Sequence, residues 1–364
     1  MATFDISRVD SDPRKHYTSV RMQQGRVLTD DDWNENERIE NEERRRTRVD
    51  VIGPFGSPDN GFRIQNPRLD SGRVDFDIQA GSLHLGGIRL ELEAKETFRL
   101  QKDWLQQSHL MGLGQSPAPG AELFDLVYLE VWQQPVSAVE DESLFEVALG
   151  GPDTTTRMRT MRRVHLASGI GVRDCAAAWR RLRQQWQTSH LGVVNEEFER
   201  IPDVRLKVSF TGSGAADDLC TPNAAGGYLG AENQAIRVQF TDRDHLTWGF
   251  DNAAPLYRVT VSANGAEVRM LTEPKDQYHW PLSGQVVEIL DWSAVLSNGE
   301  KVASTKGFMS KVSGSYNPDT GKFLLSVPLP ASFGKEWKNR NDSQSLDNQT
   351  PSEYFYLRVW NRGS

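Results

Sequence analysis

The pattern of hydrophobic and polar positions changes sharply about fifty residues into the chain. Between residues 33 and 50 the clear apolar side chains are Trp33, Ile39 and Val49, and nearly all other positions are charged or amide. A helix that packs within its own domain shows an apolar stripe. A helix that is polar on almost every side instead connects two domains, lies in solvent or docks on a partner. The pattern predicts a helix over Thr29–Val49 that serves assembly rather than a core.

Both ends of this helix carry local signals. Thr29 is a favoured N-cap residue, and Leu28 and Trp33 occupy the positions of a hydrophobic staple. Acidic residues fill the first turns and arginines the last ones, so both oppose the helix dipole favourably. Gly53-Pro54 is a stop signal. Two i,i+4 ion pairs are expected, Glu40–Arg44 and Glu42–Arg46.

After the helix, the pattern takes the period of two that half-buried strands show. Apolar residues alternate with polar ones in three runs, Val74–Ile78, Leu83–Leu85 and Ile88–Leu92. The Gly86-Gly87 pair shifts the phase, as a β-bulge or a tight bend would. Leu123–Trp132 has apolar residues at both odd and even positions, which is typical of a strand packed on both faces. A Gly- and Pro-rich loop is expected at residues 111–120.

A second helix is predicted within residues 173–190. Cys175, Trp179, Leu182 and Trp186 recur at helical spacing, and Gly192 follows as a stop. We interpret it as an amphipathic helix that covers a sheet; the alternative is a tryptophan-lined docking surface. Cys175 and Cys220 do not form a disulfide framework and are expected to be small buried hydrophobes.

The C-terminal half contains three predicted hairpins, which indicate an antiparallel sandwich or barrel. Their turns are Asn264-Gly265 and Asn298-Gly299, both suited to type I′, and the longer loop Asn317–Gly321. A strand is expected at Tyr354–Trp360, and a polar stretch at 333–352. The predicted fold is mainly β: an N-terminal arm and long polar helix (1–60), a first antiparallel β domain (61–202) with helix 173–190, and a second antiparallel β domain (203–364).

Composition excludes several classes of protein. The net charge of −8 disfavours a nucleic-acid or anionic-membrane binder. No apolar run approaches the length of a transmembrane helix, and residues 1–5 lack the features of a secretory signal. The 364-residue chain is therefore expected to fold in the cytoplasm. If it leaves the cell, we expect it to do so by lysis or as part of a particle.

Candidate chemistry is sparse. Asp30-Asp31-Asp32 could offer oxygen ligands, but consecutive helical positions point in different directions, and helix-start acids explain the run without a metal. No Ser–His–acid arrangement, zinc-helix spacing or Walker lysine is present. We therefore predict no catalytic, metal or cofactor site. The ten tryptophans leave carbohydrate binding open, because stacking on sugars requires exposed aromatic rings.

Three ordered motifs resemble one uncharacterised family, encoded in bacterial loci for phage-tail-like contractile injection systems, near baseplate proteins. They are Arg14–Tyr17 with Arg21–Leu28 and Asp32–Glu35; Phe124–Trp132 with Glu146–Asp153; and Gly226–Gln234. The resemblance implies a structural part at or near the baseplate, without established enzymatic activity. This chain departs from the family at Trp248–Asn252, which replaces a basic–acidic pair, and family members are often longer.

We therefore expect a non-enzymatic structural component of such a particle, at the baseplate or as a fibre-like appendage. The alternatives are a β-sandwich module that binds a surface glycan or receptor and, less favoured for want of any motif, a glycoside hydrolase. The family analogy implies a homo-oligomer, a trimer or a hexamer. The alternative for the arm is that Arg21–Leu28 packs onto its own β domain. The expected assembly contacts are Met22, Gln24, Arg26, Trp33, Ile39, Arg44 and Arg45.

Overall fold

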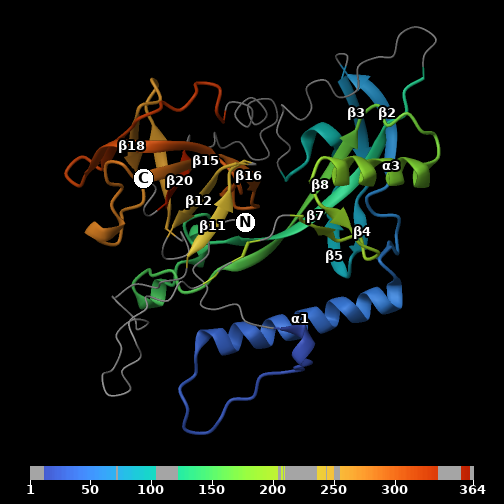
Figure 1. The fold of residues 1–364 in the computed structure, drawn as a ribbon, viewed down its shortest axis with the longest axis horizontal. Helices are drawn as coiled ribbons and strands as arrows, with labels where there is room; N and C mark the ends of the chain where they lie inside the picture. The colour runs from blue at the N-terminus through green and yellow to red at the C-terminus, as the bar shows by residue number, and fades with distance from the viewer. Residues whose placement is uncertain are drawn as a thin grey trace.

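A computed structural model describes residues 12–70, 73–103, 122–203, 206–207, 209, 236–242, 244–249, 255–334 and 354–360. Strands dominate this part of the chain, and its two α-helices are α1 (Asp30–Ile52) and α3 (Cys175–Thr188). The predicted mainly β fold is therefore confirmed. Figure 1 shows a first β region and a barrel on opposite sides of the molecule, with a long two-stranded ribbon between them.

The first β region contains two small antiparallel sheets. One has the order β1-β4-β5 and the other β2-β3-β6. Their core gathers Phe76, Ile78, Leu92 and Phe98, all nearly inaccessible, which confirms the predicted alternation. The strands are β1 (Phe55–Gly56), β2 (Ile64–Asp70), β3 (Arg73–Ile78), β4 (Gly81–Leu85), β5 (Ile88–Leu92) and β6 (Glu96–Thr97).

The ribbon consists of β7 (Leu126–Val136) and β8 (Arg157–Ala167), paired over their whole length without a bulge. One face presents Val164 and neighbouring apolar residues to the core of the first β region. The other face packs under α3, through the buried Ala178 and Leu182. The expected strand packed on both faces is confirmed, but it begins three residues later than predicted, at Leu126.

The second half forms a closed antiparallel barrel with the order β13-β14-β19-β18-β15-β20. Alternate residues point inward, and Val259, Val268, Val287 and Ile289 are fully buried there. The barrel strands are β13 (Leu256–Val261), β14 (Glu267–Met270), β15 (Val286–Leu290), β18 (Phe308–Asn317), β19 (Lys322–Leu325) and β20 (Phe355–Trp360).

Three two-stranded sheets complete the described part of the molecule. The hairpin of β16 and β17 connects the two halves, since Ala294 and Val302 pack on Val136 and Met161 at the end of the ribbon. Gln134 of β7 also donates a hydrogen bond to the carbonyl of Ala303 at 2.7 Å. The strands are β9 (Val193–Val194), β10 (Arg200–Ile201), β11 (Arg237–Phe240), β12 (Leu246–Gly249), β16 (Trp292–Val295) and β17 (Lys301–Ala303).

Several local predictions need correction. The largely apolar run 286–296 before the Asn298-Gly299 turn, which the alternation alone would predict to be one strand of that hairpin, forms two strands in different sheets, because the chain leaves the barrel at Asp291. The Asn264-Gly265 turn is not type I′: Gly265 has a φ of 74° but Asn264 does not have a positive φ. A hydrogen bond from Ser262 N–H to the Glu267 carbonyl closes a wider loop instead. Asn298 likewise lacks a positive φ, so that second type I′ prediction is also wrong.

Cys175 is exposed rather than buried. It is the first residue of α3, directly after the N-cap Asp174, whose carboxylate accepts a hydrogen bond from Ala177 N–H at 2.8 Å. The apolar face of α3 therefore begins further along, at Ala178. Cys220, the motif Gly226–Gln234 and the loop 111–120 lie outside the described residues, as does most of the polar stretch 333–352. Neither described helix combines the length and hydropathy needed to cross a membrane.

Candidate functional site

The C-terminal half of α1 rests on the turn between β4 and β5. Gly86 and Gly87 form this two-residue turn with φ values of 55° and 76°, which glycine adopts without strain. Arg45 Nη1 donates a hydrogen bond to the Gly86 carbonyl at 3.1 Å. Arg48 Nη1 donates one to the Gly87 carbonyl at 3.3 Å. The helix is therefore anchored by two guanidinium groups on one turn.

Arg45 also joins the helix to the β9–β10 hairpin. Its guanidinium lies 2.9 Å from the Glu42 carboxylate, 3.0 Å from that of Glu199 and 3.4 Å from that of Glu197. The hydrogen bonds from Arg45 lower the pKa of Glu42, and those to Glu42 raise the pKa of Arg45. Both groups therefore stay charged near neutral pH, and the contact does not depend on a titration there.

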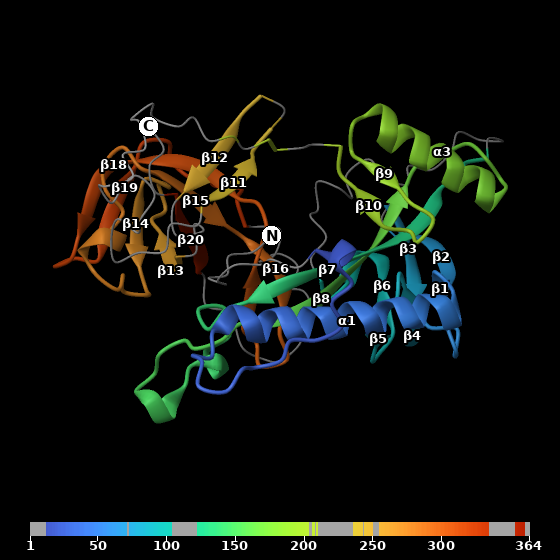
Figure 2. The same ribbon diagram turned by 60° about the horizontal axis from the view of Figure 1, so that its bottom comes forward.

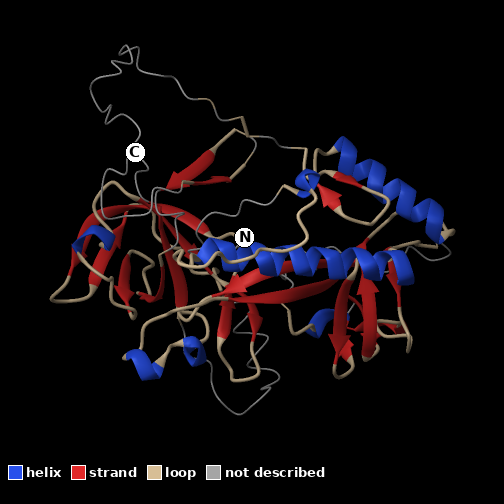
Figure 3. Cartoon of the chain, turned by 90° about the horizontal axis from the view of Figure 1, so that it is seen from below, coloured by secondary structure: helices blue, strands red, loops and turns tan. Residues whose placement is uncertain are grey.

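The rest of α1 projects past the first β region. None of its 23 residues is buried, and Trp33 is 61% exposed. Figures 1 and 2 show the helix running along one side of the molecule, from the β4–β5 turn toward the barrel side. In Figure 3 it crosses the ribbon as seen from below. A helix this long without buried residues gains little from its own domain.

The capping of α1 differs in detail from its prediction. Thr29 is the N-cap, but its hydroxyl bonds the Asp32 carboxylate at 2.7 Å rather than a backbone N–H. Leu28 and Trp33 are each 61% exposed, so the expected staple buries little of either side chain. The predicted ion pairs Glu40–Arg44 and Glu42–Arg46 are present at 3.2 and 2.7 Å. The helix ends at Ile52 before Gly53, so its last turn contains no basic residue.

In the described part of the N-terminal arm, Arg21–Leu28 lies beside α1 and does not pack onto the β domain. All residues from Arg21 to Leu28 are exposed. The backbone N–H of Val20 donates a hydrogen bond to the Asn36 side-chain oxygen at 3.0 Å, which ties the arm to the helix. The alternative in which Arg21–Leu28 covers its own β domain is therefore not observed.

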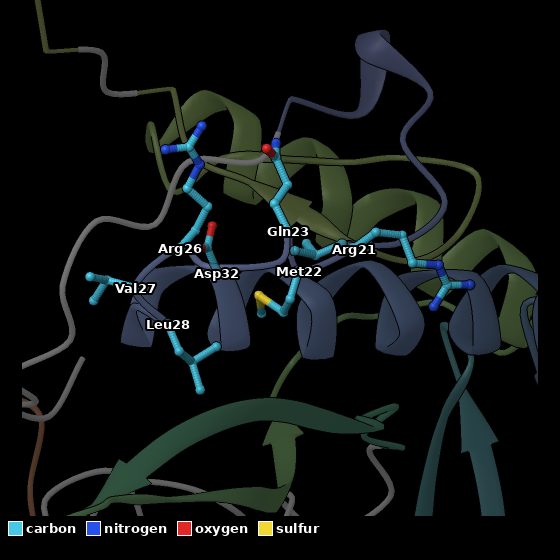
Figure 4. Close-up of a pocket in the computed structure, with 8 residues that line it drawn as sticks. Arg21, Met22, Gln23, Arg26, Val27, Leu28 and Asp32 are labelled. Carbon is cyan, nitrogen blue, oxygen red and sulfur yellow. The ribbon is translucent and has the colours of Figure 1, made fainter.

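Arm and helix enclose a shallow cavity of about 250 Å³. Figure 4 shows the polar ends of Gln23, Arg26 and Asp32 on one side of the arm, with Met22 and Leu28 pointing the opposite way. Met22 is 52% exposed. The arm thus has a polar side and an apolar side, and the apolar side is uncovered.

The structure brings the predicted contact residues into one region but gives them different environments. Met22, Gln24, Arg26, Trp33 and Arg44 are exposed, Ile39 is half-buried, and Arg45 is engaged in the intramolecular contact described above. Contact with a partner stays a prediction for the six others. Sequence reasoning missed Gly86, Gly87, Glu197 and Glu199 as the residues that seat the helix. A Gly-Gly pair between alternating runs signals the turn, but no local pattern marks the two glutamates.

A second concavity of about 620 Å³ opens in the first β region, between β1, residues 60–64 and the start of β7. Phe55, Phe62 and Tyr128 line it, and Phe55 is 61% exposed. Phe62 has a φ of 63°, in the left-handed region that bulky side chains rarely adopt, whereas the φ of 59° at Asn60 is one that asparagine adopts readily. Such strain concentrates at functional sites.

Metal chemistry finds no support in the described residues, where no three His, Cys, Asp or Glu side chains converge on one point. Gly150 and Gly151, in the segment between β7 and β8, have φ values of 94° and 91°. Gly150 is the C-cap of the short 3₁₀ helix η4 (Val147–Leu149), and its N–H bonds the Val147 carbonyl. That segment is a turn.

Comparison with known proteins assigns the chain to a family without assigning an activity. The model of a family of unknown function, DUF6519, matches residues 2–188. The chain belongs to this family. The matched residues include the arm, α1, the first β region, the ribbon and α3. No curated protein sequence and no solved structure matches the chain.

Proposed function

We propose that this protein is a non-enzymatic structural component of a phage-tail-like contractile injection particle, attached at the baseplate or as a fibre-like appendage. The observation that carries the proposal is α1, a 23-residue helix without a buried residue. It is held at one end and bears an arm with an uncovered apolar side. Such a segment is stabilised when a partner covers it.

The anchoring of α1 supports this role. The contacts of Arg45 and Arg48 with the β4–β5 turn set the direction of the helix. The exposed Met22, Leu28 and Trp33 lie at the other end, next to the arm. A partner then meets a surface whose orientation is already set, which reduces the entropy lost on binding. Large side chains such as Trp33 dominate the energetics of interfaces.

We name a contractile injection particle in this proposal because the N-terminal motif resembles that of proteins encoded beside baseplate genes. The motif occupies the arm and the start of α1, where Arg21–Leu28 and Trp33 are exposed. We propose assembly in the cytoplasm as a trimer or a hexamer, contact with baseplate proteins, and release within the particle.

A deletion strain tests the proposal. Particles purified from it should lack the density of this protein in electron micrographs, or should fail to assemble. A plasmid copy of the wild-type gene should restore complete particles. A Trp33→Ala, Met22→Ala copy should express at wild-type level but restore particles poorly. The matched control changes exposed apolar residues on the other side of the molecule, Leu246→Ala with Leu324→Ala, and should restore them fully. Normal particles in the deletion strain would contradict the structural role.

The second concavity favours one other candidate function, a glycan-binding module on the same particle. Phe55, Phe62 and Tyr128 line it together with Ser57, Asn60 and Arg63. Aromatic rings stack on the apolar faces of sugars, and hydroxyl, amide and guanidinium groups bond sugar hydroxyls.

Calorimetric titration with purified lipopolysaccharide and capsular polysaccharide of a target bacterium tests this candidate. Binding that is lost in Phe55→Ala but kept in Phe240→Ala, an exposed aromatic residue outside the concavity, would support it. Particles that form normally in the deletion strain but no longer attach to cells would favour this function over the structural one.

A further inference from the structure

The far end of the ribbon has a compact loop that the proposed function does not yet use. Between β7 and β8 the chain forms two 3₁₀ turns, η3 (Glu142–Leu144) and η4. The loop closes on itself, because Glu146 N–H bonds the Pro152 carbonyl at 3.0 Å and Gly151 N–H bonds the Glu146 carbonyl at 3.0 Å. Phe145 and Asp153 form a bridge at its base. We call residues 141–153 the ribbon tip.

The ribbon tip exposes apolar side chains where a folded loop usually presents polar ones. Val147 is 85% exposed and Leu149 is 69% exposed. All ten residues from Glu146 to Thr155 are exposed. The backbone bonds that close the loop hold both side chains outward, so a partner would meet a surface ordered before binding.

The ribbon tip is also strongly acidic. It carries Asp141, Glu142, Glu146 and Asp153, and no lysine or arginine occurs between residues 137 and 156. Arg258 lies 2.5 Å from Glu142, and Asn298 bonds Asp141 at 3.0 Å. Glu146 and Asp153 lie on the exposed stretch beside Val147 and Leu149. The outer part of the tip thus combines two apolar anchors with two carboxylates.

The N-terminal arm has the complementary character. Its described residues 12–28 include four basic side chains, Arg14, Lys15, Arg21 and Arg26, and one acidic side chain, Asp12. Asp12 is already bonded to Arg14. Val27 is 84% exposed and Leu28 is 61% exposed next to Arg26. Arm and tip lie toward the same end of the molecule in Figures 1 and 2, so both are accessible from that end.

We propose that the ribbon tip of one copy receives the arm of a second copy. Val147 and Leu149 pack against Val27, while Glu146 and Asp153 pair with Arg26, which lies beside Val27, and with Arg21. Opposite charges steer the two surfaces together and disfavour other partners, and the apolar contacts hold them. This inference rests on the proposed homo-oligomeric role, and it names the surface through which the copies join.

Charge reversal of the full-length protein tests the pairing. Glu146→Lys with Asp153→Lys should raise the dissociation constant for self-association by about tenfold or more in sedimentation velocity, and so should Arg21→Glu with Arg26→Glu. An equimolar mixture of the two variants should associate again, because each supplies the surface that the other lacks. The control reverses exposed acids outside the tip, Glu196→Lys with Asp319→Lys, and should associate as the wild type does.

The apolar anchors are tested separately. Val147→Ser with Leu149→Ser should weaken association by about tenfold or more, whereas Leu246→Ser with Leu324→Ser should not. A monomeric wild type, or tip variants that associate normally, would overturn the inference. If the tip variants associate normally but an arm deletion abolishes particle assembly, the proposed function stands and this inference falls. If the tip variants dissociate while the deletion strain makes normal particles, the inference stands and the proposed function falls.

Discussion

A β-carbon on Gly87 would lie 2.3 Å from the carbonyl oxygen of Arg45. The backbone of α1 therefore touches the backbone of the β4–β5 turn, in addition to the hydrogen bond between Arg45 and Gly86. Because any side chain at position 87 would push the helix away, this close approach couples the turn to the direction in which α1 projects. That direction decides which surfaces of the arm and helix a partner can reach.

Gly87→Ala should loosen α1 from the first β region. Alanine in this left-handed backbone conformation costs about 1 kcal/mol. The clash of its β-carbon with the Arg45 carbonyl adds to that cost. Gly299→Ala is the matched control, since Gly299 has a φ of 82° and nothing within 4 Å of the added β-carbon. Limited proteolysis should cut α1 faster in Gly87→Ala than in Gly299→Ala. Equal cleavage rates would show that the contact does not hold the helix.

Arg45→Ala should destabilise the protein more than Arg44→Ala. Arg45 is 20% exposed and bonds Gly86, Glu42, Glu197 and Glu199, so its loss should cost about 1–2 kcal/mol. Arg44 is 54% exposed, and among the described residues its ion pair is with Glu40, so its loss should cost about 0.5 kcal/mol or less. Urea unfolding of both variants measures the difference. Equal destabilisation would contradict the assignment of Arg45 to an intramolecular contact.

Removal of residues 1–52 should leave the remainder folded. The removed segment contains no buried residue among those described, and the main loss is the contact made by Arg45 and Arg48. For the 312 residues that remain, a loss of about 1–2 kcal/mol corresponds to a Tm lower by about 1.5–3 °C. The truncated protein should fail to oligomerise or to enter particles. Complete unfolding would instead show that Trp33 and Ile39 belong to an intramolecular core.

The junction of ribbon and β16–β17 hairpin contains a buried carboxylate that should make stability depend on pH. Glu140 is fully buried. Its carboxylate accepts hydrogen bonds from Ser137 N–H at 2.8 Å, Ser137 Oγ at 2.9 Å and Ala303 N–H at 2.9 Å. Burial outweighs these bonds and raises the pKa of Glu140 to about 7 from 4.5. Between these two values the folded protein keeps a proton that the unfolded chain has released.

The free energy of unfolding should therefore fall as the pH rises from 4.5 to 7, by about 3 kcal/mol from this group. Glu140→Gln cannot titrate and should lose that part of the slope, whatever its effect on absolute stability. Glu196→Gln, at an exposed position outside the ribbon tip, is the control and should keep the wild-type slope. Burial lowers the pKa of the nearby Lys301 to about 8, so its titration lies above this window. Urea unfolding at pH 5, 6, 7 and 8 measures the profiles, and an unchanged slope in Glu140→Gln would contradict the assignment.

Elements marked by neighbouring residues could be predicted from the sequence. Thr29 begins α1 and Gly53 ends it as expected, because capping and stop signals act within one turn of the chain. The alternation at Phe76 and Ile78 identified a strand, since its side chains face one core. The break at Asp291 could not be predicted, because the apolar run continues on both sides while the strand changes sheets.

The candidate site likewise has features that the sequence predicts and features that only the structure shows. Sequence alone determined that a long polar helix precedes a β-rich body, because composition and periodicity are properties of the local chain. The exposure of residues 21–28 in the arm came only from the structure. Only the tertiary structure decided that Arg45 turns inward to Gly86 and Glu199 while Trp33 remains exposed. Hydrophobic periodicity indicates which residues are buried away from water. The contact that anchors α1 is polar instead, and it joins residues more than forty and more than one hundred and fifty positions apart in the sequence. Contacts of that kind leave no period in the sequence, so they become visible only when the sheets bring the partners together.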